Sequence, residues 1–256
     1  KVGAKICIAN DPDGDRMGLA VLDNDGKWFF PNGNQIGILF AEYILNHKKN
    51  IPENGTMITT VVSTPLLDTI VKKNGKKSLR VLTGFKYIGE KIRQLDGTFL
   101  FGFEEAIGYL IGTHVRDKDA VVASMVIAEM ATTFENNGSS IYNEIMKIYE
   151  KYGWRLEITV PVTKKGKDGL EEIQKIMKSM RAKNHTEIAG IKVKEYRDYQ
   201  KGIEDLPKAD VIQMVLEDET YLTVRPSGTE PKIKFYISVV DSDRKVAEDK
   251  LAKMEK

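Results

Sequence analysis

Three carboxylates at alternate positions form a dense acidic motif near the start of the sequence. Asp11, Asp13 and Asp15 stand in the segment 11–16, DPDGDR. Negative charges this close repel one another unless a cation lies among them, and alternate positions of an extended loop share one face. Carboxylate oxygens are hard ligands that suit Mg²⁺, Ca²⁺ or Mn²⁺. Because apolar segments flank the motif, a metal loop is favoured over a solvated acidic turn.

Two known loops have a similar spacing. An EF-hand requires glycine at its sixth position and glutamate at its twelfth, but these positions are Arg16 and Leu22 here, so the EF-hand is excluded. A haloacid-dehalogenase-type phosphatase carries an apolar strand followed by DxDG, in which the first aspartate, here Asp11, is the nucleophile. Asp15 stands where that family usually has Thr or Val, and this phosphatase remains an alternative.

A second motif combines groups that bind phosphate, in the segment 225–232, RPSGTEPK. Arg225 offers a bidentate fork, Ser227 and Thr229 offer hydroxyls, and Gly228 allows a close approach of backbone N–H groups. The spacing of glycine and lysine is not that of a Walker loop. A plain Ser-Gly hairpin turn is the competing interpretation, and the clustering of these residue types favours phosphate.

Two further segments follow expected strands, where ligands bind in α/β sheets. Segment 83–86 contains Gly84 and Lys86, and segment 104–109 begins with the pair Glu104 and Glu105. The glutamates could accept hydrogen bonds from sugar hydroxyls, although spacing alone favours an exposed charged loop.

Five ionisable groups lie within residues 114–119. Lys118 or His114 could transfer protons if its pKa were lowered by burial or by positive charge nearby. The same segment fits a helix N-terminus capped by Asp117 or Asp119, and both interpretations are compatible.

The elements that must position these groups follow from hydrophobic periodicity and turn residues. We expect strands at 5–9, 17–22, 27–30, 57–62, 79–82, 98–103, 155–162, 191–196, 211–216, 221–224 and 233–240. Helices are expected from 34, at 65–73, 88–95, 120–134, 141–152 and 170–181, and from 243. The first half alternates strands and helices, which predicts an α/β domain, and the second half predicts an antiparallel α+β domain with helices on one side.

Composition narrows the class of protein. The 256 residues include 39 Lys and Arg and 37 Asp and Glu. So small an excess of positive charge does not indicate a protein that binds nucleic acid. No apolar run is long enough to span a bilayer and no signal peptide is visible. Cys7 is the only cysteine, which excludes disulfides within the chain. We expect a cytoplasmic protein that binds no membrane, and the sequence does not indicate its oligomeric state.

Taken together and in this order, four segments resemble the α-D-phosphohexomutases, the phosphoglucomutase/phosphomannomutase enzymes. Residues 11–16, 83–86, 104–109 and 225–231 are similar to the metal loop, inter-half loop, sugar loop and phosphate loop of that family. The segments FEEAIGY and TGFKYIGEKI most resemble one branch of the family. That branch contains phosphoglucomutases with phosphopentomutase or sugar-bisphosphate synthase activity, and related bacterial enzymes known as phosphomannomutases.

The resemblance implies a fold and a domain order. Residues 1–30 would end domain 2 and carry the metal loop, and residues 31–153 would form α/β domain 3, a mixed sheet covered by helices. Residues 154–256 would form the α+β domain 4, which is similar to TATA-binding protein.

The resemblance also implies a reaction, in which a phosphoserine in domain 1 phosphorylates a sugar monophosphate and recovers phosphate from the bisphosphate intermediate. Mg²⁺ would be the metal, and a sugar 1,6-bisphosphate the activator of the intact enzyme. The partner would be a small phosphosugar. By position, the implied roles are metal binding for Asp11, Asp13 and Asp15, catalysis for Lys118, His114 and Arg16, substrate binding for Gly84, Lys86, Glu104 and Arg116, and phosphate binding for Arg225, Ser227, Gly228 and Thr229. Among the substrate-binding residues, Glu104 would hold the sugar hydroxyls.

Two departures from the family pattern limit these expectations. Ala106 replaces the serine that many members carry two residues after the sugar-binding glutamate, which leaves the choice among glucose, mannose and pentose phosphates open. No serine is followed by His-Asn, so the nucleophile motif is missing and we expect the chain alone to be inactive. A non-catalytic module that binds sugar phosphates is the remaining alternative.

Overall fold

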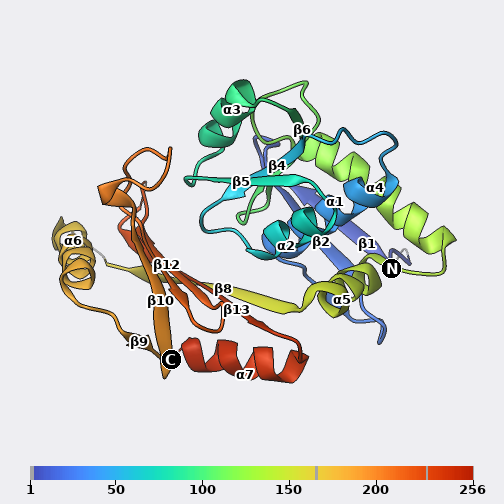
Figure 1. Cartoon of the computed structure of the whole chain (residues 1–256). Coiled ribbons are helices and arrows are strands. Elements are labelled where there is room, and N and C mark those ends of the chain that lie inside the picture. Colours follow the sequence, from blue (N-terminus) through green and yellow to red (C-terminus); the bar gives the residue numbers. More distant parts are fainter. Residues whose placement is uncertain (1–2, 165–166, 229, 256) are drawn as a thin grey trace. The chain divides into compact units, whose positions relative to one another are not determined.

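The chain folds into two compact units, Lys1–Tyr152 and Gly153–Lys256. The structure is a computed structural model that describes residues 3–164, 167–228 and 230–255. In Figure 1 the first unit runs from blue to yellow-green and the second from yellow to red. The predicted fold class, an α/β domain followed by an α+β domain, is confirmed.

The first unit begins with a three-stranded antiparallel ribbon. Its strands are β1 (Ile6–Asn10), β2 (Met17–Leu22) and β3 (Trp28–Phe29), in that spatial order. Alternate residues of β2 (Met17, Leu19 and Val21) are buried, as expected for a strand with one face on the core. The acidic segment 11–16 is the connection between β1 and β2, so the ribbon fixes both ends of the acidic loop.

A four-stranded mixed sheet forms the rest of this unit, in the order β5-β4-β6-β7. Its strands are β4 (Gly55–Thr60), β5 (Lys77–Val81), β6 (Thr98–Glu104) and β7 (Gly108–Ile111). The helices are α1 (Gly33–His47), α2 (Leu66–Lys73), α3 (Phe85–Gln94), α4 (Ala120–Asn136) and α5 (Ile141–Tyr152). β4 is parallel to β5 and β6, while β7 is antiparallel to β6. The carboxyl ends of three parallel strands therefore meet at one edge of the sheet.

Strand β6 contains a shift of register that the sequence does not reveal. Thr56 pairs with Phe99, but the next residue of β4 pairs with Phe101. The extra residue turns the strand, as a bulge does. Phe99 consequently packs with α3, whereas Phe101 lies against Phe40 of α1. Simple alternation would have placed both rings on one face.

Two strands were not expected from the sequence. The segment after β6 was predicted to be a loop up to Lys118, but it contains β7, whose short GYLI run follows the acidic turn too closely to show a pattern. β9 (Glu187–Ile188) is only two residues long.

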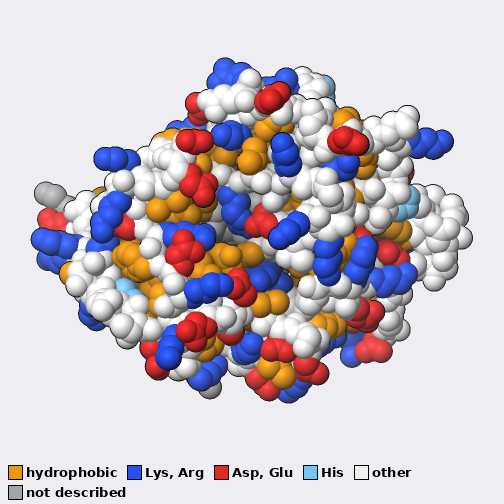
Figure 2. All heavy atoms as spheres, in the orientation of Figure 1, with side chains coloured by type: hydrophobic (Ala, Val, Ile, Leu, Met, Phe, Trp, Pro, Cys, Tyr) orange, Lys and Arg blue, Asp and Glu red, His pale blue; other side chains and the backbone are white. Residues whose placement is uncertain are grey.

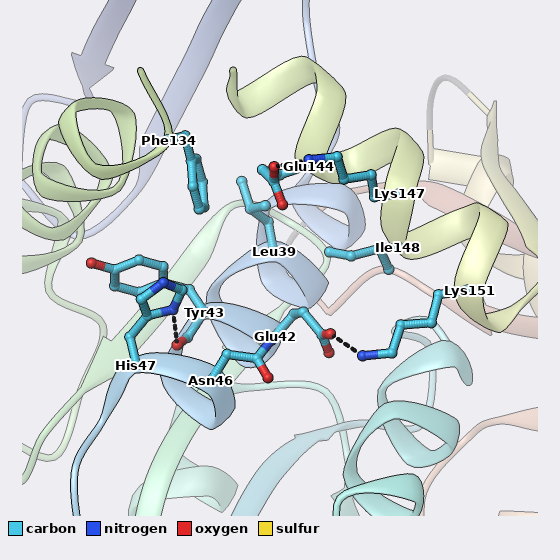
Figure 3. Close-up of a pocket in the computed structure, with 10 residues that line it drawn as sticks. All are labelled: Leu39, Glu42, Tyr43, Asn46, His47, Phe134, Glu144, Lys147, Ile148 and Lys151. Carbon is cyan, nitrogen blue, oxygen red and sulfur yellow. Dashed lines mark hydrogen bonds and ion pairs between the residues drawn. The ribbon is translucent and has the colours of Figure 1, made fainter. Parts of the chain in front are cut away.

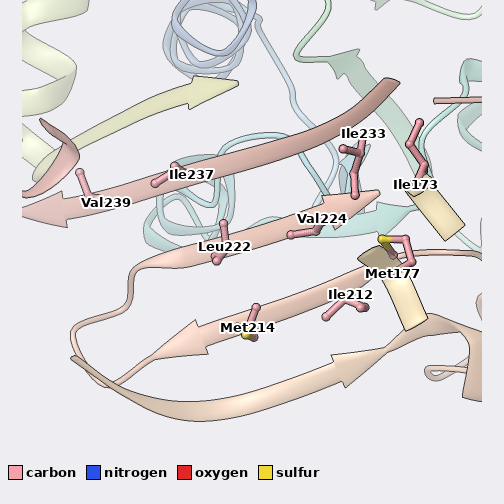
Figure 4. Packing of buried hydrophobic residues seen from close by; sticks show 9 residues of the cluster. All are labelled: Ile173, Met177, Ile212, Met214, Leu222, Val224, Ile233, Ile237 and Val239. Atoms are coloured by element: carbon pink, nitrogen blue, oxygen red, sulfur yellow. The ribbon is translucent and has the colours of Figure 1, made fainter. Parts of the chain in front are cut away.

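The second unit is a six-stranded antiparallel sheet, in the order β8-β13-β12-β11-β10-β9. Ile173 and Met177 of helix α6 belong to its hydrophobic core (Figure 4), and Leu251 and Met254 of helix α7 pack against that core. The remaining elements are β8 (Trp154–Thr163), α6 (Lys167–Ala182), β10 (Ile191–Asp198), η1 (Tyr199–Lys201), β11 (Ile212–Leu216), β12 (Tyr221–Pro226), β13 (Lys232–Asp241) and α7 (Arg244–Met254).

The surface agrees with the balanced composition. On the face drawn in Figure 2, acidic and basic side chains are interspersed, and neither sign covers a large continuous area. Among the described residues, no helix is long and apolar enough to cross a membrane.

Gly37 tests how tightly α1 packs on the sheet. A Cβ at this position would lie 2.4 Å from the ring of Phe103. We expect Gly37→Ala to destabilise the first unit by about 1–3 kcal/mol through overpacking, although alanine favours a helix by about 1 kcal/mol. Urea unfolding followed by circular dichroism measures the change. Adding Phe103→Leu should recover part of the loss, and a Gly37→Ala variant as stable as the wild type would contradict the packing.

Candidate functional site

The acidic loop is a compact turn rather than the extended segment that the alternating carboxylates suggested. The backbone N–H of Gly14 donates to the carbonyl of Asp11 at 3.0 Å. The carboxylate of Asp11 accepts from the backbone N–H of Asp15 (3.1 Å) and Arg16 (3.0 Å) and from Nε of Arg16 (2.6 Å). Hydrogen bonding to Arg16 lowers the pKa of Asp11 to about 2, against some desolvation. Asp11 therefore organises the loop.

The three aspartates still converge. One carboxylate oxygen from each of Asp11, Asp13 and Asp15 lies within 4.8 Å of the other two. Oδ1 of Asp15 is buried and accepts no hydrogen bond from the described residues, and its ion pair with Nε of Arg16 is long, at 3.4 Å. A buried carboxylate oxygen without a donor is costly unless a cation binds it. The donor set and this oxygen fit a hard divalent cation.

Lys118 joins this loop from another part of the chain. Its Nζ lies 3.1 Å from Oδ2 of Asp15 and 3.0 Å from Oδ1 of Asp117, and 5.3 Å from the centre of the Phe85 ring. Burial acts to lower the pKa of Lys118, but the hydrogen bonds to Asp117 and Asp15 outweigh it and raise the pKa. The lowered pKa that was the condition for proton transfer by Lys118 is thus not found. The two carboxylates hold Lys118 as a cation.

His114 and Arg116 lie on the same loop as Lys118 but are held by local partners. Nε2 of His114 is 2.7 Å from Oδ2 of Asp119. Oδ1 of Asp119 accepts the N–H of Val122, so Asp119 is the N-cap of α4. The guanidinium of Arg116 donates to the carbonyls of Thr113 and Val115. Of the two cap candidates in the sequence, Asp119 is therefore the one that is used.

Backbone contacts join the acidic loop to the loop after β6. The N–H of Met17 donates to the carbonyl of Ile107 at 3.0 Å, and Arg16 forms an isolated β-bridge with Gly108. A Cβ at Gly108 would lie 2.4 Å from Cδ of Lys118, so a side chain there would displace the stem of this lysine. The acidic loop, the segment 104–109 and Lys118 consequently form one site within the first unit.

The two adjacent glutamates of this loop are fastened to different segments. Glu104 is only 9% exposed, which is contrary to the exposed loop that spacing alone favoured. Its Oε1 accepts the N–H of Gly84 at 2.7 Å, so segment 83–86 meets the loop there. Lys86 extends over the ring of Tyr87. The predicted residues Gly84 and Glu104 are thus brought together.

The predicted phosphate segment lies in the second unit, in the hairpin between β12 and β13. Arg225 pairs with Lys234 across the hairpin and donates to the hydroxyl of Tyr236 at 3.4 Å. The N–H of Ser227 donates to the carbonyl of Lys232 at 2.7 Å. A Cβ at Gly228 would meet no atom of the described residues within 4 Å, so none of them requires glycine there. Thr229 lies outside the described residues.

A hollow of about 210 Å³ between α1, α4 and α5 contains none of the predicted site residues (Figure 3). Its charged side chains pair with one another, since Lys151 lies 2.7 Å from Glu42 and Lys147 lies 2.7 Å from Glu144. The acidic loop and its neighbours remain the better candidate site.

Comparison with known proteins decides the family. Residues 32–149 match the family described as phosphoglucomutase/phosphomannomutase, alpha/beta/alpha domain III, and residues 157–251 match the C-terminal domain of the same family. The chain belongs to the phosphoglucomutase/phosphomannomutase family. A Staphylococcus aureus phosphoglucomutase is 37% identical over 252 residues, covering 93% of this chain and 45% of that protein. The chain thus spans about half the length of this relative.

Solved structures share the fold. Parafusin, a phosphoglucomutase from Paramecium in an open form, aligns with a TM-score of 0.69 at 18% identity over 97% of this chain and 44% of that chain. An Aspergillus fumigatus N-acetylphosphoglucosamine mutase in complex with GlcNAc-6P and magnesium aligns with a TM-score of 0.56 at 15% identity, covering 95% of this chain and 50% of that chain.

Some neighbours of the site in this family member were not singled out from the sequence. Asp117, which was considered only as a helix cap, forms the second ion pair of Lys118. The oxygen Oγ1 of Thr83, beside Gly84, is buried without a hydrogen-bond partner among the described residues. The position of Thr83 at the end of a strand and the position of Asp117 next to Lys118 in the sequence were the available signals.

Asp13 offers the cleanest test of the cation site, because its side chain is exposed and does not hold the loop together. We expect Asp13→Asn to weaken binding of Mg²⁺ or Mn²⁺ roughly tenfold or more, since affinity follows the number of charged ligands. Titration with Mn²⁺, followed by electron paramagnetic resonance, measures it. Asp25→Asn, in the exposed turn between β2 and β3, is the matched control. Equal affinity in wild type and Asp13→Asn would make the loop a solvated turn.

Proposed function

We propose that this chain is the metal-, sugar- and phosphate-binding part of a phosphosugar mutase. In this proposal, residues 1–30 end domain 2, residues 31–153 are domain 3 and residues 154–256 are domain 4. The mutase moves phosphate between the 1-position and the 6- or 5-position of a sugar through a phosphoserine outside these residues and a sugar bisphosphate. The observation that carries the proposal is the union of the acidic loop, Lys118 and the Glu104 loop in one site.

Asp11, Asp13 and Asp15 would hold Mg²⁺, the ion named in the related Aspergillus structure with its sugar phosphate. The ion would supply neutralisation of charge on the transferred phosphoryl group. Arg16, half exposed beside Asp11 and Asp15, adds a cation with a fixed Nε position. Phosphoryl transfer depends mainly on such positioning and charge neutralisation.

Lys118 would act as the proton donor of the site. Its two carboxylate neighbours keep the ammonium charged, so it can give a proton to a sugar oxygen as the phosphoryl group leaves. His114 and Arg116, on the same loop, would contact the substrate from the exposed side. Glu104 would accept hydrogen bonds from sugar hydroxyls, with Gly84 and Lys86 beside it.

The phosphate that does not react would bind the β12–β13 hairpin. Arg225 supplies the charge, and Ser227, Gly228 and Thr229 would supply hydroxyl and N–H donors. The exposed Ala106 leaves the choice of sugar open, so phosphopentomutase or sugar-bisphosphate synthase activity remains within the proposal. A sugar 1,6-bisphosphate would prime the intact enzyme.

The phosphatase alternative fits the geometry poorly. A nucleophilic Asp11 needs a carboxylate oxygen that can approach phosphorus, but both of its oxygens accept hydrogen bonds within the loop. The pKa of about 2 also makes this carboxylate a weak nucleophile.

Removing the phosphate fork should weaken substrate binding. We expect Arg225→Ala to cost about 1.5–3 kcal/mol in the binding of glucose 6-phosphate, the value of a hydrogen bond to a charged group. Isothermal titration calorimetry measures it. Lys245→Ala, which removes an exposed cation from α7 in the same unit, should leave the affinity unchanged. Unaltered binding in Arg225→Ala would remove the hairpin from the site.

An activity assay tests whether the reaction needs a phosphoserine outside these residues. In a coupled assay with Mg²⁺, glucose 1-phosphate and a trace of glucose 1,6-bisphosphate, we expect no mutase activity from this chain, because it lacks the serine motif. Mannose and ribose phosphates serve as parallel substrates. Activity should appear when a phosphoserine-bearing N-terminal half of a relative is supplied. Activity of the chain alone that Asp11→Asn abolishes would instead support the aspartate nucleophile, and binding without turnover in both mixtures would support a non-catalytic module.

A further inference from the structure

Arg80 holds a turn in place by hydrogen bonds, at the edge of the sheet where the candidate site lies. It stands in β5, and its side chain is only 21% exposed. Its Nη1 donates to the carbonyls of Thr60 (3.0 Å) and Ser63 (3.1 Å), its Nη2 to the carbonyl of Thr64 (3.0 Å), and its Nε to Oδ2 of Asp68 (2.8 Å). One guanidinium thus fixes the turn 60–64, which connects β4 to α2.

The hydroxyls of this turn converge on the second glutamate of the sugar loop. Oγ1 of Thr60 and Oγ of Ser63 lie 2.8 Å apart, and they lie 3.5 Å and 3.4 Å from Oε2 of Glu105. Both hydroxyl residues are buried, at 0% and 3% exposure. Glu105 directly follows Glu104, so its anchor determines where β6 ends and how the loop begins.

The loop needs such an anchor because its backbone is strained. Ile107 has a φ of +57°, a conformation that a β-branched residue rarely adopts. The cost is about 1–2 kcal/mol, and such residues persist only where their surroundings over-determine them. On the opposite side, Gly33 of α1 lies so close that a Cβ there would be 2.0 Å from the carbonyl oxygen of Glu105.

We propose that Arg80 is a positioning residue for sugar recognition, which acts through the turn 60–64 and Glu105 on the placement of Glu104. The inference rests on the proposed function, since it assigns Glu104 to the sugar. Arg80 itself does not touch the substrate. Its planar fork reaches three carbonyls at once, which a lysine ammonium on a flexible stem would not reproduce.

The test separates the sugar from the phosphate. Calorimetry gives the affinities of the chain for glucose 6-phosphate and for inorganic phosphate, and their ratio is the sugar increment. Arg80→Met keeps the stem but removes the fork. We expect it to lower the sugar increment roughly 3- to 10-fold, the value of one hydrogen bond to the sugar. Binding of inorganic phosphate and of Mn²⁺ should change less than twofold. Arg93→Met, an exposed arginine of the same unit, is the matched control and should change none of these values.

A double mutant distinguishes positioning from general destabilisation. If Arg80 acts through Glu105, then Arg80→Met combined with Glu105→Ala should lose no more of the sugar increment than the stronger single variant. Fold losses that multiply would overturn the proposal, as would an unchanged sugar increment in Arg80→Met. If Arg80→Met does not fold, Ser63→Ala removes one hydroxyl while leaving the arginine and its carbonyls, and the same loss is expected.

Failure of the proposed function would be recognised separately, as a wild-type chain that binds glucose 6-phosphate no better than phosphate. In that case hydrogen exchange of the ligand-free chain still decides the role of Arg80. Amides of residues 105–108 should exchange faster in Arg80→Met and in Ser63→Ala than in wild type and Arg93→Met. Unchanged exchange would overturn the positioning role.

Discussion

The ion pair between Lys118 and Asp15 is the contact on which the site depends, because it joins two loops about a hundred residues apart. The acidic loop carries three carboxylates within 4.8 Å of one another, and a second cation beside Arg16 relieves their repulsion. Glycine at position 108 leaves space for the lysine stem, and the β-bridge between Arg16 and Gly108 keeps the two loops in register. Without the ammonium, the partly buried carboxylate of Asp15 would lose one of its ion-pair partners.

Charge within the acidic loop is divided by position. The carboxylate of Asp11 accepts hydrogen bonds from the N–H groups of Asp15 and Arg16, and these bonds contribute to its low pKa. Asp13 remains exposed, and Asp15 keeps one oxygen without a hydrogen-bond donor. Asp11 therefore shapes the turn, although one of its oxygens still lies within 4.8 Å of an oxygen of Asp13 and of Asp15. This division explains how the six-residue segment 11–16 can be fixed by its own hydrogen bonds and still offer carboxylate oxygens to a cation.

Periodicity and turn residues predicted most elements of the fold, and the alternate spacing of three aspartates predicted the acidic cluster. The helix at 141–152 and the strand at 17–22 have the expected bounds, since strong apolar patterns and clear stops define them. The expectation that Glu104 is exposed was wrong. Its carboxylate can be buried because it accepts a hydrogen bond from the N–H of Gly84, a distant residue that no local pattern indicates. The bulge in β6 and the contact of Lys118 with Asp15 are likewise tertiary, so they could not be predicted from the sequence.

Two hairpins of the first unit have the same arrangement of strands and differ in the hydrogen-bond donors that their carboxylates receive. In each, a strand ends in an acidic loop and an antiparallel strand returns, β1 to β2 and β6 to β7. In the first loop an oxygen of Asp15 has no donor from the described residues, and a cation is the group that such an oxygen prefers. In the second loop, the N–H of Gly84 donates to Glu104, and Glu105 lies within hydrogen-bond distance of the paired hydroxyls of Thr60 and Ser63. A carboxylate held in this way needs no further positive charge, and neutral hydroxyl donors suit it better than a metal. The hydrogen-bond donors that neighbouring loops provide, more than the number of acidic residues, therefore determine whether each loop suits a cation or neutral hydroxyl groups.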